Sequence, residues 1–236
     1  MFSRTISVAF ILMGSLIFCK NSVAQQQQQH EGVWLGGQVQ IKFSNKWAWQ
    51  HDGGFRTAGT TFLTQQYLYR TGARYFVHKN LSFVGGGAIF FSRSSLDQSN
   101  HEFGREWRLW QEAFHSVSLK KILWQNRFTT EQRFFEETNK KPAYTAYRFR
   151  IKTIFTKPVS EKWSLQLSDE YLRQAANRVF TFDQNRLMLY GLYNQNATTT
   201  FRTGYMWLLL PGRISRHILN MNYLKTLHVK QPKYKV

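Results

Sequence analysis

The sequence predicts an all-β protein: a single transmembrane antiparallel up-and-down β-barrel of about 12 strands, with about 10 as the alternative. Three observations predict this fold. Apolar and polar residues alternate along most of the chain, the alternating segments are long, and short connections alternate with longer ones. Alternate side chains of a strand face opposite sides of the sheet. Each predicted strand therefore has one apolar, aromatic face and one polar face rich in arginine.

Residues 1–24 have the features of a cleaved signal peptide. Arg4 gives a positive start, and the apolar segment 6–18 has the length of a signal-peptide core but is too short to span a bilayer as a helix. Small residues at Ser22 and Ala24 predict cleavage after Ala24. Cleavage would also remove Cys19, the single cysteine of the chain, which suits an oxidising compartment. We expect export to the outer membrane of a Gram-negative bacterium.

The remaining chain divides into three predicted parts. Residues 25–31 are rich in glutamine, and we expect a flexible arm there. Residues 32–228 hold the alternating segments and are predicted to form the barrel, whereas residues 229–236 form a basic tail. The alternating segments run roughly 10 to 16 residues, against about 5 or 6 for strands of globular proteins. Such lengths are typical of strands that cross a bilayer at a tilt.

The connections have two lengths, as in transmembrane barrels. Short turns such as 44–46 and 78–80 alternate with longer polar loops such as 92–105 and 173–180. Aromatic residues follow several short turns, where an amphipathic ring would favour the membrane interface. The predicted interfacial girdle comprises Trp47, Trp49, Phe83, Trp124 and Trp163.

Two points stay open at this level. A soluble exported β-barrel or β-sandwich that binds an apolar ligand would show the same alternation with its apolar faces inside. Strand length, loop asymmetry and the export signal favour the membrane barrel. In addition, an even strand count places both termini at one end, yet the first alternating segment, 33–43, starts on the side of the long loops. Either a further strand exists, or the N-terminal arm passes through or around the barrel.

The charged residues of the polar faces are predicted to lie in the lumen. Buried charges are tolerable when they are paired and hydrogen-bonded, so we expect a network that holds the barrel together. The alternative is a polar path in which the excess of arginine favours anions. The predicted lumen network comprises Glu106, Arg108, Arg127, Glu131, Arg133, Arg148, Arg150, Glu170, Arg186 and Arg202.

A formal net charge of +19 first suggests nucleic acid or an acidic membrane surface as a partner. The export signal and the separation of aromatic and basic faces argue against nucleic acid, so we expect outer-membrane lipids as the partner. The sequence has no G-x-S-x-G, H-E-x-x-H, P-loop or C-x-x-C motif, and its histidines lack metal-ligand spacing. We therefore expect no catalytic residues, no metal and no cofactor. The glycine run 85–87, inside a strand, indicates a close-packed or bent position.

Short motifs recur along the predicted barrel in a recognisable order. They are GVW at 32–34, EWRLWQ at 106–111, NRF at 126–128, EQRF at 131–134, YRFR at 147–150, SDE at 168–170, FDQNR at 182–186, GY at 204–205 and HILN at 217–220. In this order they resemble the bacterial family called domain of unknown function 2490, whose members are presumed outer-membrane β-barrels. The resemblance covers nearly all of the chain after the signal peptide. It implies the barrel and its location, and it implies no activity.

These observations together predict a non-enzymatic outer-membrane barrel, either structural or a narrow path for solutes or anions. A membrane-embedded enzyme that modifies lipid or lipopolysaccharide is the alternative. The sequence indicates no oligomeric state.

Overall fold

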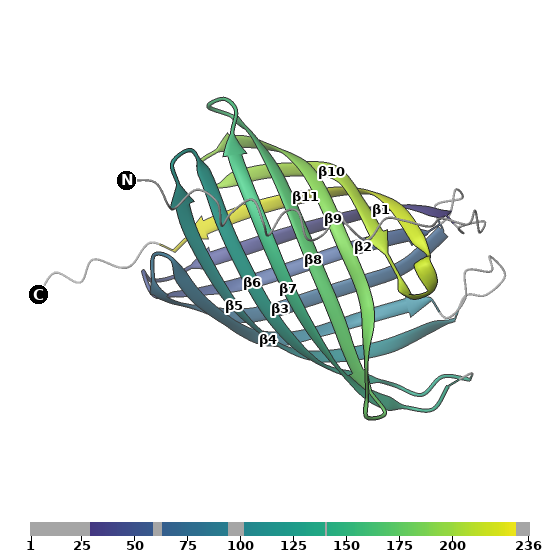
Figure 1. The fold of residues 1–236 in the computed structure, drawn as a ribbon. Helices are drawn as coiled ribbons and strands as arrows, with labels where there is room; N and C mark the ends of the chain where they lie inside the picture. Colours follow the sequence, from purple (N-terminus) through teal and green to yellow (C-terminus); the bar gives the residue numbers. More distant parts are fainter. Residues whose placement is uncertain (1–28, 59–62, 94–101, 140, 230–236) are drawn as a thin grey trace, which may run out of the picture.

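The computed structural model describes residues 29–58, 63–93, 102–139 and 141–229. The predicted signal peptide, residues 25–28 of the predicted arm and residues 230–236 of the predicted tail lie outside the described residues. Within the described ranges, eleven strands form one closed barrel (Figure 1). They are β1 (Gln29–Lys42), β2 (Trp47–Ala58), β3 (Leu63–His78), β4 (Leu81–Arg93), β5 (Phe103–Leu119), β6 (Ile122–Phe135), β7 (Tyr144–Pro158), β8 (Trp163–Ala176), β9 (Val179–Asn196), β10 (Thr199–Leu209) and β11 (Ser215–His228), with a short 3₁₀ helix at Pro211–Arg213.

The predicted closed all-β barrel is confirmed, but the expected count of about 12 strands is wrong. From β2 to β11 each strand pairs antiparallel with the next, and β1 closes the barrel between β2 and β11. β1 is antiparallel to β2 and parallel to β11, with Leu35 opposite both Phe55 and Met221. An odd number of up-and-down strands forces one parallel pair, because the first and last strands then run in the same direction. This pairing explains why the first alternating segment starts on the long-loop side without a further strand.

At both ends of the described residues, the barrel extends slightly beyond the predicted range of 32–228. Strand β1 begins at Gln29 rather than at Gly32, and Gln29 to Glu31 pair with Ser215 to His217. At the other end, the amide of Val229 donates to the carbonyl of Lys42 at 2.9 Å. The last described residue is therefore still held against the first strand.

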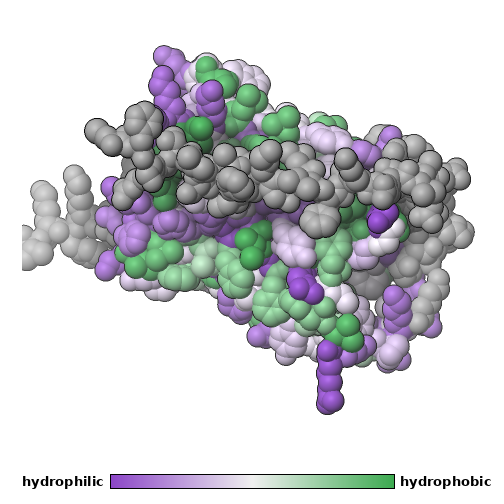
Figure 2. Space-filling model, in the orientation of Figure 1, coloured by the Kyte–Doolittle hydropathy of each residue, from purple (hydrophilic) through white to green (hydrophobic). Residues whose placement is uncertain are grey.

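The strands are 11 to 18 residues long, and buried and exposed side chains alternate along the central part of several of them. In β8 every second residue from Ser164 to Leu172 is buried and every intervening one is exposed. The inner face of this segment carries mostly polar residues, with Glu170 1% exposed, whereas Leu165, Leu167 and Tyr171 are exposed on the outer face. The visible wall in Figure 2 carries many apolar residues, with hydrophilic residues among them and at both ends.

One predicted long loop, 173–180, is instead a tight turn. Strand β8 continues to Ala176 and β9 starts at Val179, so Asn177 and Arg178 alone connect them. Both residues have positive φ, 49° and 64°. Two consecutive residues of this kind make the turn whose twist matches a β-hairpin, and asparagine tolerates that conformation well.

The expected close packing at the glycine run is found at Gly86. A Cβ atom there would lie 2.0 Å from the carbonyl oxygen of Thr71 and 2.6 Å from the Cα of Gly72, its partner on β3. At neighbouring Gly85 a Cβ would meet nothing within 4 Å. Next to this contact the Trp110 ring is buried with Val84, Ala88 and Phe90, forming an apolar cluster inside the barrel.

Candidate functional site

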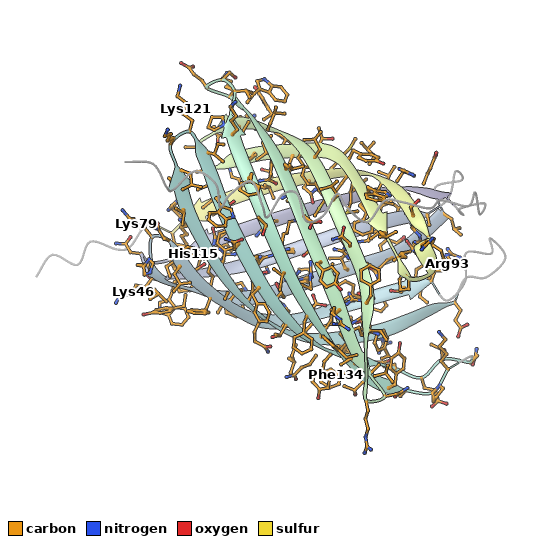
Figure 3. The ribbon with its side chains drawn as sticks, viewed as in Figure 1. Lys46, Lys79, Arg93, His115, Lys121 and Phe134 are labelled. Atoms are coloured by element: carbon orange, nitrogen blue, oxygen red, sulfur yellow. The ribbon has the colours of Figure 1, made fainter. Side chains whose placement is uncertain are left out.

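The most distinctive site of the molecule is the charged interior of the barrel. Strands β5 to β9 each point charged side chains inward, because those residues share one parity along their strands. Glu106, Glu131 and Glu170 are only 1–3% exposed, and the arginines between them are under 10% exposed. Figure 3 shows side chains on both faces of the wall, with Lys46, Lys79 and Lys121 at the short-turn end and Arg93 at the opposite end.

A continuous chain of ion pairs crosses five neighbouring strands. Glu106 accepts hydrogen bonds from Nε of Arg108 and from Nε of Arg133, each at 2.5 Å. Arg108 also donates from Nη1 to Glu131 at 3.1 Å, and Glu131 accepts Nη1 of Arg150 at 2.6 Å. Arg108 thus pairs with two carboxylates, and Glu106 and Glu131 each accept from two arginines, which is the arrangement that makes buried charges tolerable.

Glu170 on β8 is the second centre of this chain. It accepts hydrogen bonds from Nη2 of Arg150 at 2.6 Å, from Nη2 of Arg127 at 3.0 Å and from Nη1 of Arg186 at 3.3 Å. Arg148 reaches Glu131 at 3.8 Å and pairs more closely with Asp183, at 2.9 Å. Nine of the ten residues of the predicted lumen network are therefore joined by ion pairs.

Arg202 is the exception in the predicted set. It points into the lumen, but among the described residues it forms no ion pair, and its Nε has no hydrogen-bond acceptor. Its guanidinium lies instead 4.9 Å from the Tyr190 ring centroid.

Further lumen charges were not included in the predicted set. Glu112 pairs with Arg127 at 3.4 Å and with Arg74 at 3.9 Å, and Asp52 pairs with Arg70 at 3.8 Å. The parity that marks Glu106 and Arg108 also marks Glu112, so extending the same rule along β5 would have found it. Asp183 follows a turn, and strand alternation alone does not single it out.

Aromatic rings also line the interior, although the sequence predicted that the aromatic faces of the strands point outward. The Arg108 guanidinium lies 3.5 Å from the Phe90 ring centroid, and the Arg70 guanidinium lies 4.1 Å from the Trp110 ring centroid. The Trp34 ring lies 4.0 Å from Arg56 and 5.4 Å from Arg186. Such cation–π contacts supplement the ion pairs inside the barrel.

A cavity of about 450 Å³ remains among these groups. Asp52 and Glu112 are the two carboxylates of its lining. Nine arginines line it: Arg56, Arg70, Arg74, Arg108, Arg127, Arg148, Arg150, Arg186 and Arg202. The cavity therefore has a strong excess of positive charge.

The predicted girdle residues lie on the outer face near the short turns. Trp47, Trp49, Phe83 and Trp163 are 41–49% exposed, whereas Trp124 is half-buried and stacks on Phe155 with ring centroids 6.2 Å apart. The indole of Trp49 donates to the Thr71 hydroxyl at 2.7 Å.

The described residues contain neither a cluster of metal ligands nor a membrane-spanning helix. Among them, no group of three or more His, Cys, Asp or Glu side chains is placed to hold a metal ion. In the same ranges, no helix is both long and apolar enough to cross a membrane.

Comparison with known proteins gives a family. The model of the family described as "Protein of unknown function (DUF2490)" matches residues 31–213. The chain belongs to this family. The resemblance drawn from the motifs is thereby confirmed, although the last motif, at 217–220, lies beyond the matched residues. No curated protein and no solved structure matched the chain. The region of this chain that matches DUF2490 runs from β1 to the 3₁₀ helix before β11.

Proposed function

We propose that this DUF2490 protein is a non-enzymatic outer-membrane β-barrel. The observation that carries the proposal is the inverted distribution of polarity: charged residues fill the interior, and large apolar side chains cover the outside. Leu165, Leu167, Ile151 and Leu189 are 45–57% exposed on the outer face. Soluble proteins rarely expose contiguous apolar surfaces of this extent, and lipid-facing barrel walls require them.

The short-turn end fits a membrane interface. Trp47, Trp49, Phe83 and Trp163 project outward there, and amphipathic rings favour the level of the headgroups. Lys46, Lys79 and Lys121 lie at the same end (Figure 3). Lysines just beyond an aromatic band attract anionic lipid headgroups. Outer-membrane lipids are therefore the proposed partner, and this end faces the periplasm.

The lumen network supports a structural role over a catalytic one. Each of Glu106, Glu131 and Glu170 is held by two or more arginines. Carboxylates engaged in this way stabilise neighbouring strands and are poorly suited to exchange protons with a substrate.

Membrane fractionation and heat-modifiable gel migration test the proposal. We expect the protein in the outer-membrane fraction, with faster migration of the unheated form, because folded barrels resist unfolding by detergent at room temperature. Recovery in the soluble periplasmic fraction would contradict the location. A change in lipid or lipopolysaccharide composition in a deletion strain would contradict the non-enzymatic role.

A narrow anion path is a second candidate, favoured by the nine arginines that line the lumen cavity. In planar bilayers under a salt gradient, we expect a small conductance whose reversal potential indicates anion preference. Arg202→Glu reverses a lumen charge without removing an ion pair, so it should reduce that preference. An unchanged reversal potential would exclude the path through this cavity.

A further inference from the structure

The lumen has more cations than its carboxylates can neutralise. Six described carboxylates bond to lumen arginines, and every one has an arginine nitrogen within 4 Å: Asp52, Glu106, Glu112, Glu131, Glu170 and Asp183. Every one of these six carboxylates is therefore already paired with at least one arginine.

Arg56 and Arg202 are the two cavity arginines that make no ion pair within the described ranges. Arg56 donates from Nη1 to the Gln66 side-chain oxygen at 2.6 Å and stacks 4.0 Å from Trp34. Arg202 contacts Tyr190 and leaves its Nε unsatisfied. A charge that is removed from bulk water without a counter-charge is costly, so both positions favour an anion in the cavity.

The surroundings of Trp34 provide donors for such an anion. Arg56 and Arg186 both lie against this ring, at 4.0 Å and 5.4 Å. Arg108, Arg148 and Arg150 line the same cavity. The buried Trp34 Nε1 has no acceptor among the described residues. Two guanidiniums beside one ring and a free indole N–H suit an oxyanion, because arginine binds phosphate and carboxylate oxygens with two N–H groups at once.

We propose that the lumen cavity binds a multivalent oxyanion of phosphate type, held by Arg56, Arg186 and Trp34 Nε1, with Arg202 as a second contact. The volume of about 450 Å³ lies within the range of small-molecule sites. This inference deepens the anion candidate and names its ligand class. It requires binding alone, so it holds whether or not the anion crosses the barrel.

Titration of the purified full chain in detergent tests the site, with inorganic phosphate as the probe and sodium chloride at equal ionic strength as the reference. Calorimetry should show saturable phosphate binding, and phosphate should raise the unfolding temperature more than chloride does. The double variant Arg56→Gln with Arg202→Gln should bind phosphate at least about tenfold more weakly. Absence of saturable binding, or equal effects of chloride and phosphate, would overturn the proposal.

Two further variants make the test specific. Arg105→Gln removes an arginine on the outer face, where Arg105 is 49% exposed beside Glu136, and should leave phosphate affinity unchanged. Trp34→Phe keeps a ring but removes the N–H group, and should weaken binding several-fold even if the arginine variants fail to fold. Equal phosphate affinity of the wild-type protein and Trp34→Phe would show that the indole N–H does not bind the anion.

The location of the protein does not enter this measurement. A soluble protein that bound phosphate would contradict the proposed membrane role and support the site. An outer-membrane barrel without saturable binding would support the role and overturn the site.

Discussion

The guanidinium of Arg150 donates two hydrogen bonds to one carboxylate oxygen of Glu170, from Nε at 3.0 Å and from Nη2 at 2.6 Å. Its remaining donor, Nη1, reaches Glu131 on the other neighbouring strand at 2.6 Å. Arg150 therefore connects β6, β7 and β8 through side chains, in addition to the backbone ladder. These side-chain links add to the apolar clusters that also fill the interior.

Loss of the Glu170 charge should destabilise the barrel strongly. Glu170→Gln keeps the shape of the side chain but leaves Arg150, Arg127 and Arg186 without their shared counter-charge. Breaking a buried pair from one side costs about 3–5 kcal/mol, because an uncompensated charge remains. Urea unfolding of the refolded protein should show this loss. The control, Glu136→Gln, removes an exposed pair with Arg105 and should cost under about 1 kcal/mol. Equal losses in the two variants would contradict the network.

The outer wall should reject charge when it lies in lipid. Leu189 is 54% exposed near the middle of β9, and Leu119 is 47% exposed at the short-turn end of β5. In bilayers Leu189→Arg should lower the free energy of unfolding by about 2–4 kcal/mol, and Leu119→Arg by at most about 1 kcal/mol. In a soluble protein both exposed substitutions would stay within about 0.5 kcal/mol. The depth dependence therefore separates a membrane wall from a wet surface.

Adjacent glycines on β4 should differ sharply in their tolerance of a methyl group. At Gly86 the added Cβ would clash with the backbone of Thr71 and Gly72, whereas at Gly85 it would meet nothing within 4 Å. Overpacking against backbone typically costs about 1–3 kcal/mol, so Gly86→Ala should lower the unfolding midpoint. Gly85→Ala should leave it nearly unchanged, and a similar loss at both positions would argue against the close approach of β3 and β4.

Alternation in the sequence predicted which way a side chain points, because that depends only on the two-residue repeat of a strand. It therefore predicted that Glu106 and Arg108 share one face with each other. It did not predict which residues meet, because Glu170 finds Arg127 from two strands away only after tilt and register are set. Residue type was a weaker guide: Trp110 shares the parity of Glu106 and lies inside, although aromatic character suggested the outer face.

Strand number was the part that local pattern could not fix. Each alternating segment is visible alone, but closure depends on how the first and last segments meet. The parallel pairing of β1 with β11 is a long-range choice, and it places the start of β1 and the end of β11 at opposite ends of the barrel. The assumption of an even count therefore led to about 12 strands instead of eleven.

The parallel closure can be tested by cross-linking in a Cys19→Ser background. Leu35 and Met221 are register partners on β1 and β11, and both side chains are exposed on the outer wall. Leu35→Cys with Met221→Cys should form a disulfide under mild oxidation, because neighbouring strands lie roughly 5 Å apart. The control pair, Phe55→Cys with Met221→Cys, spans two strand spacings across β1 and should stay reduced. A ten-stranded barrel without β1 would bring β2 against β11. Cross-linking of the control pair alone would therefore contradict the eleven-stranded fold and support the ten-stranded alternative.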